Sequence, residues 1–187
     1  LRSPRPIQNY LTDSQDGLNW IMIGDASENS RYITSTKKKI IKDGLNKTRS
    51  VRKGDFLLTN SMSFGHPYIL QVDGCIHDGW LVMSPKTDLV NNHYFYNYLS
   101  SKPLYNEFSR RAAGAVVKNL NTTIVKQILI AIPPIKVQNK FACFAESIED
   151  QKKLHHQHLI ELNNLFSTLQ QRAFSGEIGR ASCRERV

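Results

Sequence analysis

The stretch GAVVKNLNTTIVKQILIAIPPIKVQNKFACF, residues 114–144, decides how this sequence is organised. Its apolar run at residues 128–132 predicts a buried strand, which ends at Pro133 and Pro134. Because proline fixes φ and biases the preceding residue toward extended geometry, the strand must stop there and the chain must leave in a set direction. From Val137 the pattern predicts a helix to about Ser175, with Gly176 as a natural C-cap.

The predicted helix carries a seam of residues in alternating steps of four and three, which is typical of a coiled coil. The seam is apolar at both ends and polar in the middle, and a polar centre helps to fix pairing and register. An unbroken helix would reach about 55–60 Å, so its terminal leucines need a partner. The alternative is a helix folded back over its own domain. The seam positions are Val137, Phe141, Phe144, Ile148, Gln151, His155, His158, Leu162, Leu165 and Leu169.

The part before the double proline reads as a β-rich domain with short helices, so the sequence predicts an α+β fold followed by one long coiled-coil helix. The expected division is a compact domain at 1–136, the helix at 137–178, and a disordered or adventitious tail at 179–187. Strands are expected at 18–23 and at 80–83. Residues 51–59 predict a turn at 53–55 followed by an apolar strand, and residues 68–76 predict a hairpin with an Asp-Gly turn. Residues 91–113 predict two helices broken near Pro103, and strand-like runs return at 116–120 and 124–132.

The positive charge of the chain is concentrated in one segment. The formal net charge is +9, and residues 31–53 alone contain nine basic residues and one acid. A local basic cluster with interleaved Thr, Ser and Asn is typical of a surface that contacts phosphates. A merely solvated surface is the alternative.

General sequence signals exclude several classes of protein. The chain has no GxxxxGK[ST] loop, no GxGxxG after a strand, and no apolar run of eighteen residues that would span a membrane. The three cysteines, at positions 75, 143 and 183, form no CxxC pair, so neither a disulfide framework nor a zinc site is predicted. Cys75 and Cys143 are expected to be buried. The start of the chain lacks the apolar core of a signal peptide, so we expect a cytoplasmic protein.

Three local patterns resemble catalytic or metal motifs but have simpler explanations. Residues 150–152 match an acid-x-Lys pattern, yet they lie inside the heptad helix, where such pairs are routine surface charge. His155 and His158 share a helix face, but no further ligand has a fixed position, so a polar coiled-coil layer is favoured over a metal site. His77 and Asp78 are strand neighbours that point to opposite faces, and no nucleophile motif accompanies them. No catalytic or metal-ligating residue is therefore expected.

Several short stretches, in their order and spacing, resemble the specificity (S) subunit of type I restriction–modification systems. The resemblance is to one target recognition domain with the conserved helix that follows it, and it covers roughly residues 18–178. The stretches are WIMIGD at 20–25, KGDFLL at 53–58, NSMSFGHPYI at 60–69, Gly114 with VKNL at 117–120, IAIPP at 130–134 with Gln138, and LQQRAFSGE at 169–177.

This resemblance implies DNA recognition without catalysis in the chain itself. Members of the family pair two recognition domains through two long helices, and each domain reads one half of an interrupted DNA target. Modification (M) subunits methylate adenine with S-adenosylmethionine, and restriction (R) subunits add ATP-driven translocation and cleavage. The resemblance therefore implies S-adenosylmethionine, ATP and Mg in partner subunits, no cofactor in this chain, a target recognition domain at 1–136, and a spacer and dimerisation helix at 137–178.

The chain departs from the family pattern in having one recognition domain and one helix. It is either a fragment of a two-domain subunit, which the starting Leu1 favours, or a half-length version that forms a homodimer through its heptads. Two further alternatives are a coiled-coil interaction protein whose basic domain binds RNA or an acidic protein, and the recognition part of a single-chain restriction–methyltransferase. The positions expected to pair are Phe141, Phe144, Ile148, His155, His158, Leu162, Leu165 and Leu169.

The residues expected to contact DNA fall into two groups, because phosphate contacts position a protein whereas base-edge contacts specify sequence. The basic segment suits phosphates. The loop at 60–66 suits base edges, since it combines short polar donors, an aromatic ring and a glycine, although ordinary turn chemistry explains it equally well. Arg110 and Arg111 suit either DNA or the end of their own helix. Expected phosphate contacts are Arg31, Lys37, Lys38, Lys39, Lys42, Lys47 and Arg49, with Lys118 as an outlier, and expected base contacts are Asn60, Ser61, Ser63, Phe64 and His66.

Overall fold

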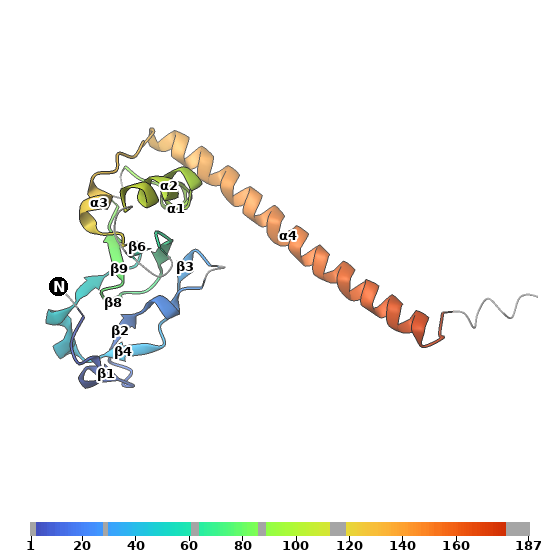
Figure 1. Cartoon of the computed structure of the whole chain (residues 1–187), viewed down its shortest axis with the longest axis horizontal. Helices are drawn as coiled ribbons and strands as arrows, with labels where there is room; N and C mark the ends of the chain where they lie inside the picture. Colours follow the sequence, from blue (N-terminus) through green and yellow to red (C-terminus); the bar gives the residue numbers. More distant parts are fainter. Residues whose placement is uncertain (1–2, 28–29, 61–63, 86–88, 113–118, 179–187) are drawn as a thin grey trace, which may run out of the picture. The chain divides into compact units, whose positions relative to one another are not determined.

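A computed structural model of the chain describes residues 3–27, 30–60, 64–85, 89–112 and 119–178 (Figure 1). The chain divides into two compact units, Leu1–Ala142 and Cys143–Val187. The first unit contains the strands, the short helices and the start of the long helix α4 (Ile135–Phe174), and the second contains the rest of α4. The predicted tail at 179–187 lies outside the described residues.

Two sheets form the framework of the first unit. The five-stranded sheet is ordered β1–β4–β2–β8–β5, with β2 and β8 as a parallel pair and the other neighbours antiparallel. The four-stranded sheet is ordered β3–β7–β6–β9, with β3 parallel to β7. The strands are β1 (Leu11–Thr12), β2 (Leu18–Ile21), β3 (Tyr32–Ile33), β4 (Lys38–Ile40), β5 (Arg49–Val51), β6 (Phe56–Thr59), β7 (Pro67–Leu70), β8 (Gly74–Ile76) and β9 (Trp80–Met83). Three short 3-10 helices join them: η1 (Ile7–Asn9), η2 (Ile23–Asp25) and η3 (Lys42–Lys47).

The hydrophobic core is layered around β6 and β7, which are buried at all four of their positions. Strands covered on both faces are expected to read as continuous apolar runs, as these do. On one face, the two sheets bury a shared cluster: Ile21, Ile33, Val51, Leu57, Tyr68, Leu70, Ile76 and Trp80. On the other face, α1 (Asn92–Leu99) and α2 (Lys102–Arg111) cover a second cluster: Phe56, Leu58, Ile69, Phe95, Leu99, Leu104, Phe108 and Leu120.

The two short helices predicted in residues 91–113 are confirmed, and each has a side-chain cap. The side-chain oxygen of Asn91 accepts hydrogen bonds from the backbone N–H groups of His93 and Tyr94 at the start of α1. Ser101 caps α2 in the same way. Pro103 lies in the first turn of α2, where the missing N–H costs no intrahelical hydrogen bond.

The hairpin predicted at residues 68–76 is wrong, because β7 and β8 belong to different sheets. The chain crosses from one sheet to the other at the Asp-Gly pair instead of turning back. The Asp73 carboxylate accepts from the Lys53 backbone N–H at 2.7 Å. Gly74 lies against β2, where a Cβ would stand 2.6 Å from the carbonyl oxygen of Asn19. Glycine is therefore required here by close backbone approach, not by a hairpin turn.

Two other strand predictions need correction. The strand predicted at 18–23 ends at Ile21, where the chain turns into η2. The strand-like run at 124–132 instead begins with the short helix α3 (Thr122–Lys126), whose cap is Asn121. Residues 128–132 form no strand: the carbonyl of Ala131 accepts from the Tyr94 hydroxyl in the helical layer, and alternate side chains face the core and the solvent. Most of the run predicted at 116–120 lies outside the described residues.

The long helix is confirmed, and it begins at Ile135, slightly before the predicted start. It ends at Phe174, one residue before the predicted end, and the predicted cap Gly176 has φ +78°. The N–H of Gly176 donates to the Ala173 carbonyl at 3.2 Å, and the N–H of Glu177 donates to the Arg172 carbonyl at 3.0 Å. This pair of bonds is a Schellman motif, which satisfies the last carbonyls of a helix.

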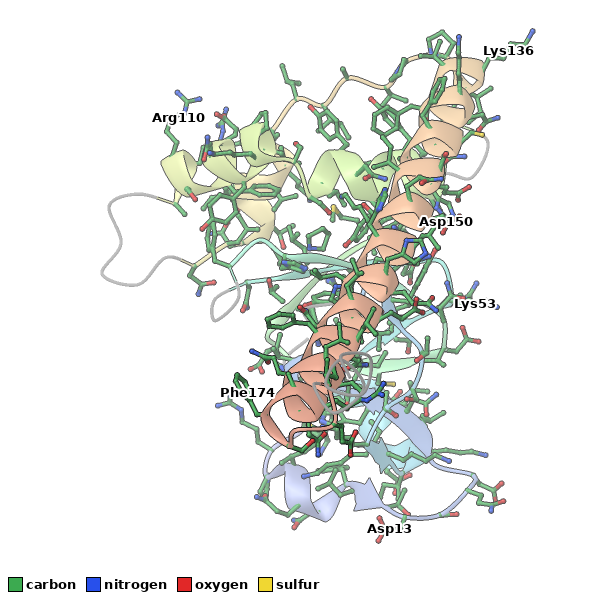
Figure 2. The ribbon with its side chains drawn as sticks, turned by 90° about the vertical axis from the view of Figure 1, so that its right-hand side faces the viewer. Asp13, Lys53, Arg110, Lys136, Asp150 and Phe174 are labelled. Atoms are coloured by element: carbon green, nitrogen blue, oxygen red, sulfur yellow. The ribbon has the colours of Figure 1, made fainter. Side chains whose placement is uncertain are left out.

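The apolar seam of α4 is exposed in this single chain. Phe144 is 61% exposed and Leu162 is 62% exposed, and the other apolar seam positions are similarly open. Figure 2 shows side chains projecting from the helix between Lys136 and Phe174. Cys75 is buried as predicted, but the prediction for Cys143 is wrong, since it lies on the exposed surface of α4. Among the described helices, none is long and apolar enough to cross a bilayer.

Candidate nucleic-acid interface

The basic segment 31–53 spreads its charge over the width of the five-stranded sheet. It supplies β4 and β5 to that sheet and β3 to the other, and η3 joins β4 to β5. Because β2 and β8 lie between β4 and β5, the outer two strands are about 14 Å apart at the usual strand spacing. Basic residues that are close in sequence are therefore distributed across the width of the sheet, with Lys38 and Arg49 on opposite faces.

Most basic side chains of this segment have no partner inside the protein. Within the described residues, six exposed members form no side-chain hydrogen bond or ion pair, although nearby acids bind some of their backbone N–H groups. An exposed cation without an internal partner can bind a phosphate without breaking a contact in the protein. The six are Lys37, Lys38, Lys42, Arg49, Arg52 and Lys53.

The other three basic residues of the segment are tethered. The guanidinium carbon of Arg31 lies 5.4 Å from the centre of the Tyr96 ring. The Lys39 ammonium donates to the Gln15 carbonyl at 2.9 Å. Lys47 donates to the Tyr10 hydroxyl and lies 4.8 Å from the centre of that ring. These contacts hold the three side chains in fixed positions.

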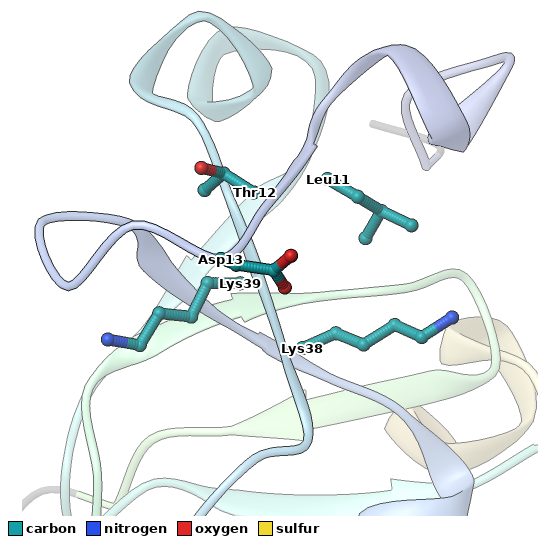
Figure 3. Close-up of a pocket in the computed structure, with 5 residues that line it drawn as sticks. All are labelled: Leu11, Thr12, Asp13, Lys38 and Lys39. Carbon is teal, nitrogen blue, oxygen red and sulfur yellow. The ribbon is translucent and has the colours of Figure 1, made fainter.

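Lys38 and Lys39 line a hollow of about 240 Å³ with Leu11, Thr12 and Asp13 (Figure 3). Neighbouring residues on a strand point to opposite faces, and in Figure 3 the two ammonium groups extend in opposite directions with the Asp13 carboxylate between them. The hollow therefore does not concentrate two positive charges on one anion. Lys38 is the exposed member of the pair.

Asn60, expected to contact a base edge, is engaged inside the protein. Its backbone N–H donates to the Gly79 carbonyl at 3.1 Å, and its side-chain Nδ2 donates to the Asp78 carbonyl at 2.9 Å. Its own carbonyl accepts from the Leu120 N–H at 2.7 Å. Asn60 thus connects three loops. Ser61 and Ser63, the neighbouring candidates, lie outside the described residues.

Phe64 and His66 lie together at the rim of a hollow of about 270 Å³. The Phe64 ring packs edge-on against Tyr105 with centres 6.1 Å apart, and the His66 ring lies 4.9 Å from the Tyr68 ring. Lys102 adds a cation to the same rim. The structure brings these two predicted residues together in the lining of one hollow, with Tyr105 beside them.

His77 and Asp78 stabilise the loop between β8 and β9 through hydrogen bonds. Nδ1 of His77 accepts from the Gly79 N–H at 2.7 Å, and burial lowers the pKa of His77. The Asp78 carboxylate accepts from the Ser3 hydroxyl at 3.1 Å and from Arg5 at 3.2 Å. Burial raises the pKa of Asp78, but these hydrogen bonds and the nearby His77 outweigh it, so the pKa lies below its usual value. Both side chains therefore hold the loop in place.

Arg110 and Arg111 share one carboxylate. Arg110 lies 2.7 Å and Arg111 lies 2.6 Å from the Glu107 oxygens, and hydrogen bonds from Arg111 and then Arg110 lower the pKa of Glu107. Arg111 also reaches Gln127 at 3.4 Å. Arg110 extends outward from α2 in Figure 2. Because Glu107 offsets one of the two arginine charges, these three residues leave one net positive charge at the C-terminal end of α2. Lys118 lies outside the described residues.

Sequence reasoning missed two residues of the basic surface. Arg52 and Lys53 belong to the basic segment 31–53 but were not among the expected phosphate contacts, and they line a polar hollow of about 510 Å³. Ser50, Ser84 and Asn92 contribute polar groups to its wall, and Asp55 partly offsets its charge. The count of basic residues in 31–53 was the signal that could have identified both.

The described residues contain no group of three or more His, Cys, Asp or Glu side chains placed to hold a metal ion. In α4, the rings of His155 and His158 are 6.5 Å apart on one helix face, as their spacing indicates. This pair therefore lies in the polar centre of the seam.

A β-rich domain with an unpaired basic surface and a long exposed helix defines a class of DNA-binding recognition domain carried on a helical arm. The chain belongs to the family of type I restriction modification DNA specificity domains, whose family model matches residues 2–164. The resemblance seen in the sequence is thus confirmed.

Two solved structures share the fold. One is a chain from a study of complex assembly and conformational transition of the type I R-M system, with a TM-score of 0.70 and 18% identity over 92% of this chain and 42% of that one. The other is the HsdS subunit from Thermoanaerobacter tengcongensis, with a TM-score of 0.60 and 18% identity over 80% of this chain and 34% of that one. The present chain therefore spans less than half the length of either.

Proposed function

We propose that this chain is the DNA sequence-recognition (specificity) subunit, or half of one, of a type I restriction–modification complex. The observation that carries the proposal is the set of six exposed, unpartnered cations on a chain of the specificity-domain family. Acting on DNA in the cytoplasm, the chain directs adenine methylation and DNA cleavage that its partner subunits perform. It performs no chemistry of its own.

The spacing of the basic strands suits duplex DNA. The distance of about 14 Å between β4 and β5 corresponds to about four base steps along one strand at 3.4 Å each. Cations near β4 and β5 that share a face can thus contact phosphates several steps apart. Such contacts fix the position of a protein on the duplex without specifying sequence. Lys38, whose register runs through Trp20 and Cys75 to Ser50, lies on the face opposite Arg49.

Sequence reading is assigned to the loop after β6. Ser61, Ser63, Phe64 and His66 are the base-edge candidates, and Lys118 is a further phosphate contact. The hydrogen bonds that join Asn60 to Gly79, Asp78 and Leu120 support a rigid base for this loop. Rigid placement favours discrimination between bases, because a displaced donor loses its hydrogen-bond geometry.

Partners and cofactors follow from the same assignment. The chain binds double-stranded DNA and modification (M) and restriction (R) subunits, and S-adenosylmethionine, ATP and Mg bind to those subunits. The exposed apolar seam of α4 supports pairing with a second recognition half or with a second copy of this chain.

A binding selection tests this assignment. The chain is incubated with random duplex DNA, bound sequences are recovered, and affinity for the selected site is measured against salt. We expect one preferred half-site and a slope of log affinity against log salt of about −0.9 for each phosphate contact. Equal binding to unrelated duplexes, or preference for RNA, would instead indicate the interaction-protein alternative.

A further inference from the structure

Gln138 is a fully buried polar residue near the start of α4, and every polar group of its side chain is used. Its Nε2 donates to the Leu89 carbonyl at 2.9 Å and to the Pro133 carbonyl at 2.7 Å. Its Oε1 accepts from the Asn91 N–H at 2.8 Å. One side chain therefore joins α4 to the double proline and to the start of α1.

Neighbouring contacts strengthen the same junction. The Asn91 side chain donates to Oδ1 of Asn139 at 2.9 Å. The rings of Tyr94 and Phe141 meet edge-on with centres 5.6 Å apart, and Ala142 is buried. The first two turns of α4 thus form part of the recognition domain.

The junction connects to the sheet through α1. Phe95 of α1 packs edge-on against Phe56 of β6, with ring centres 5.0 Å apart, and Leu99 is buried in the same cluster. β6 leads directly into Asn60 and the candidate reading loop. The start of α4 and the reading loop therefore rest on one packed layer.

We propose that Gln138 is a positioning residue that sets the direction in which α4 leaves the recognition domain, and through it the spacing between two DNA half-sites. This inference rests on the proposed function. A helix of 40 residues is about 60 Å long, so a tilt of about 5° at its start moves its far end by about 5 Å. Such a displacement exceeds one base step of about 3.4 Å.

Gln138→Met keeps the length of the side chain and removes its polar atoms. The carbonyls of Leu89 and Pro133 and the N–H of Asn91 then lose their buried partner, which the junction can restore only by shifting or by admitting water. Ile40→Ala is the control, because Ile40 is buried in the five-stranded sheet and belongs neither to the junction nor to the packed layer beneath it.

The test uses the full chain assembled with its modification subunit and duplexes whose two half-sites are separated by spacers of different length. Methylation rate is measured for each spacer. We expect the unmodified chain to methylate targets with one extra or one missing base pair about tenfold more slowly than its best target. In Gln138→Met this penalty falls to about twofold while the half-site sequence is unchanged, whereas Ile40→Ala slows all targets alike.

The results test the role of Gln138 and the proposed function separately. A sharp spacer optimum in folded Gln138→Met, equal to that of the unmodified chain, overturns the role of Gln138. If Gln138→Met does not fold, the spacer optimum is measured in Asn139→Ala instead, because Asn139 is exposed and its loss leaves no buried cavity. An optimum as sharp as that of the unmodified chain then overturns the proposal. Absence of sequence-specific methylation at every spacer, by the unmodified chain and by the full-length gene as well, overturns the proposed function itself.

Discussion

The backbone carbonyl of Asn60 accepts a hydrogen bond from the N–H of Leu120 at 2.7 Å, which ties the loop after β6 to the segment before α3. The side chain of the same residue binds the Asp78 carbonyl, so a third loop joins the contact. We therefore expect Asn60 to position the reading surface, and its contact with a base edge stays a prediction.

Asn60→Ala removes the side-chain bond to Asp78, and we expect stability to fall by about 1 kcal/mol. Because the reading loop loses an anchor, the affinity ratio between selected and unrelated duplexes should fall about tenfold, with the salt slope unchanged. Asn97→Ala is the matched control, since the Asn97 side chain also donates to a backbone carbonyl, that of His93, but within α1. Equal loss of discrimination in both variants contradicts this role.

The unpartnered cations should each contribute to the salt dependence of DNA binding. Arg49→Gln and Lys53→Gln are each expected to lower affinity for all sequences and to reduce the magnitude of the salt slope by about 1. Arg110→Gln should change the slope less, because the Arg110 charge is shared with Glu107. Titrations at several salt concentrations measure the slopes. A larger change for Arg110 than for Arg49 is the opposing result.

Burial of His77 predicts a specific pH dependence of stability. Because burial holds its pKa in the folded state below the usual value of about 6.5, the folded protein favours the neutral ring. The free energy of unfolding should therefore be independent of His77 above about pH 6.5, should decrease as the pH falls from about 6.5 toward the folded pKa, and should level off below that pKa. Asp78, whose pKa is lowered, acts in a more acidic range.

Denaturant unfolding of His77→Gln measured between neutral and mildly acidic pH tests this. The variant should lose the part of the pH slope that His77 supplies. His156→Gln, on the exposed surface of α4, is the control and should keep the slope. An unchanged slope in His77→Gln excludes His77 as the titrating group.

The exposed seam of α4 predicts helix pairing. Leu162→Asp combined with Leu165→Asp should abolish self-association or association with a second recognition half, because both side chains are more than half exposed and would place charge in the seam. Ile160→Asp is the control, since Ile160 is similarly exposed but lies outside the seam. Sedimentation velocity distinguishes the species. Dissociation by Ile160→Asp alone would assign the contact to another face.

Local signals were sufficient to predict α4 and its end. The heptad spacing defines the helix, and Gly176 supplies the left-handed residue that the C-cap needs. Local signals could not predict which strands pair. Asp73-Gly74 looks like a hairpin turn, but glycine is required at position 74 because it lies against Asn19, which is far away in the sequence. Residues 128–132 have a strand composition, yet none of the described strands pairs with them.

For the candidate site too, some features could be predicted from the sequence and others could not. The basic segment was visible as charge in the sequence, whereas the tethering of Arg31 by Tyr96 and the pairing of Arg110 with Glu107 depend on side-chain contacts in the fold. The engagement of Asn60 by three other residues has no signature in the sequence, since Asn is equally common in turns and in DNA contacts.

The central claim, that this chain specifies a DNA target for partner enzymes, is tested most directly by methylation mapping. The chain is co-expressed with the modification subunit encoded beside it, and methylated adenines are mapped over the genome. The account predicts new methylation at one interrupted sequence, which is palindromic if two copies pair. No new methylation, when the same partner is active with a complete specificity subunit and the full-length gene also fails, would contradict the claim.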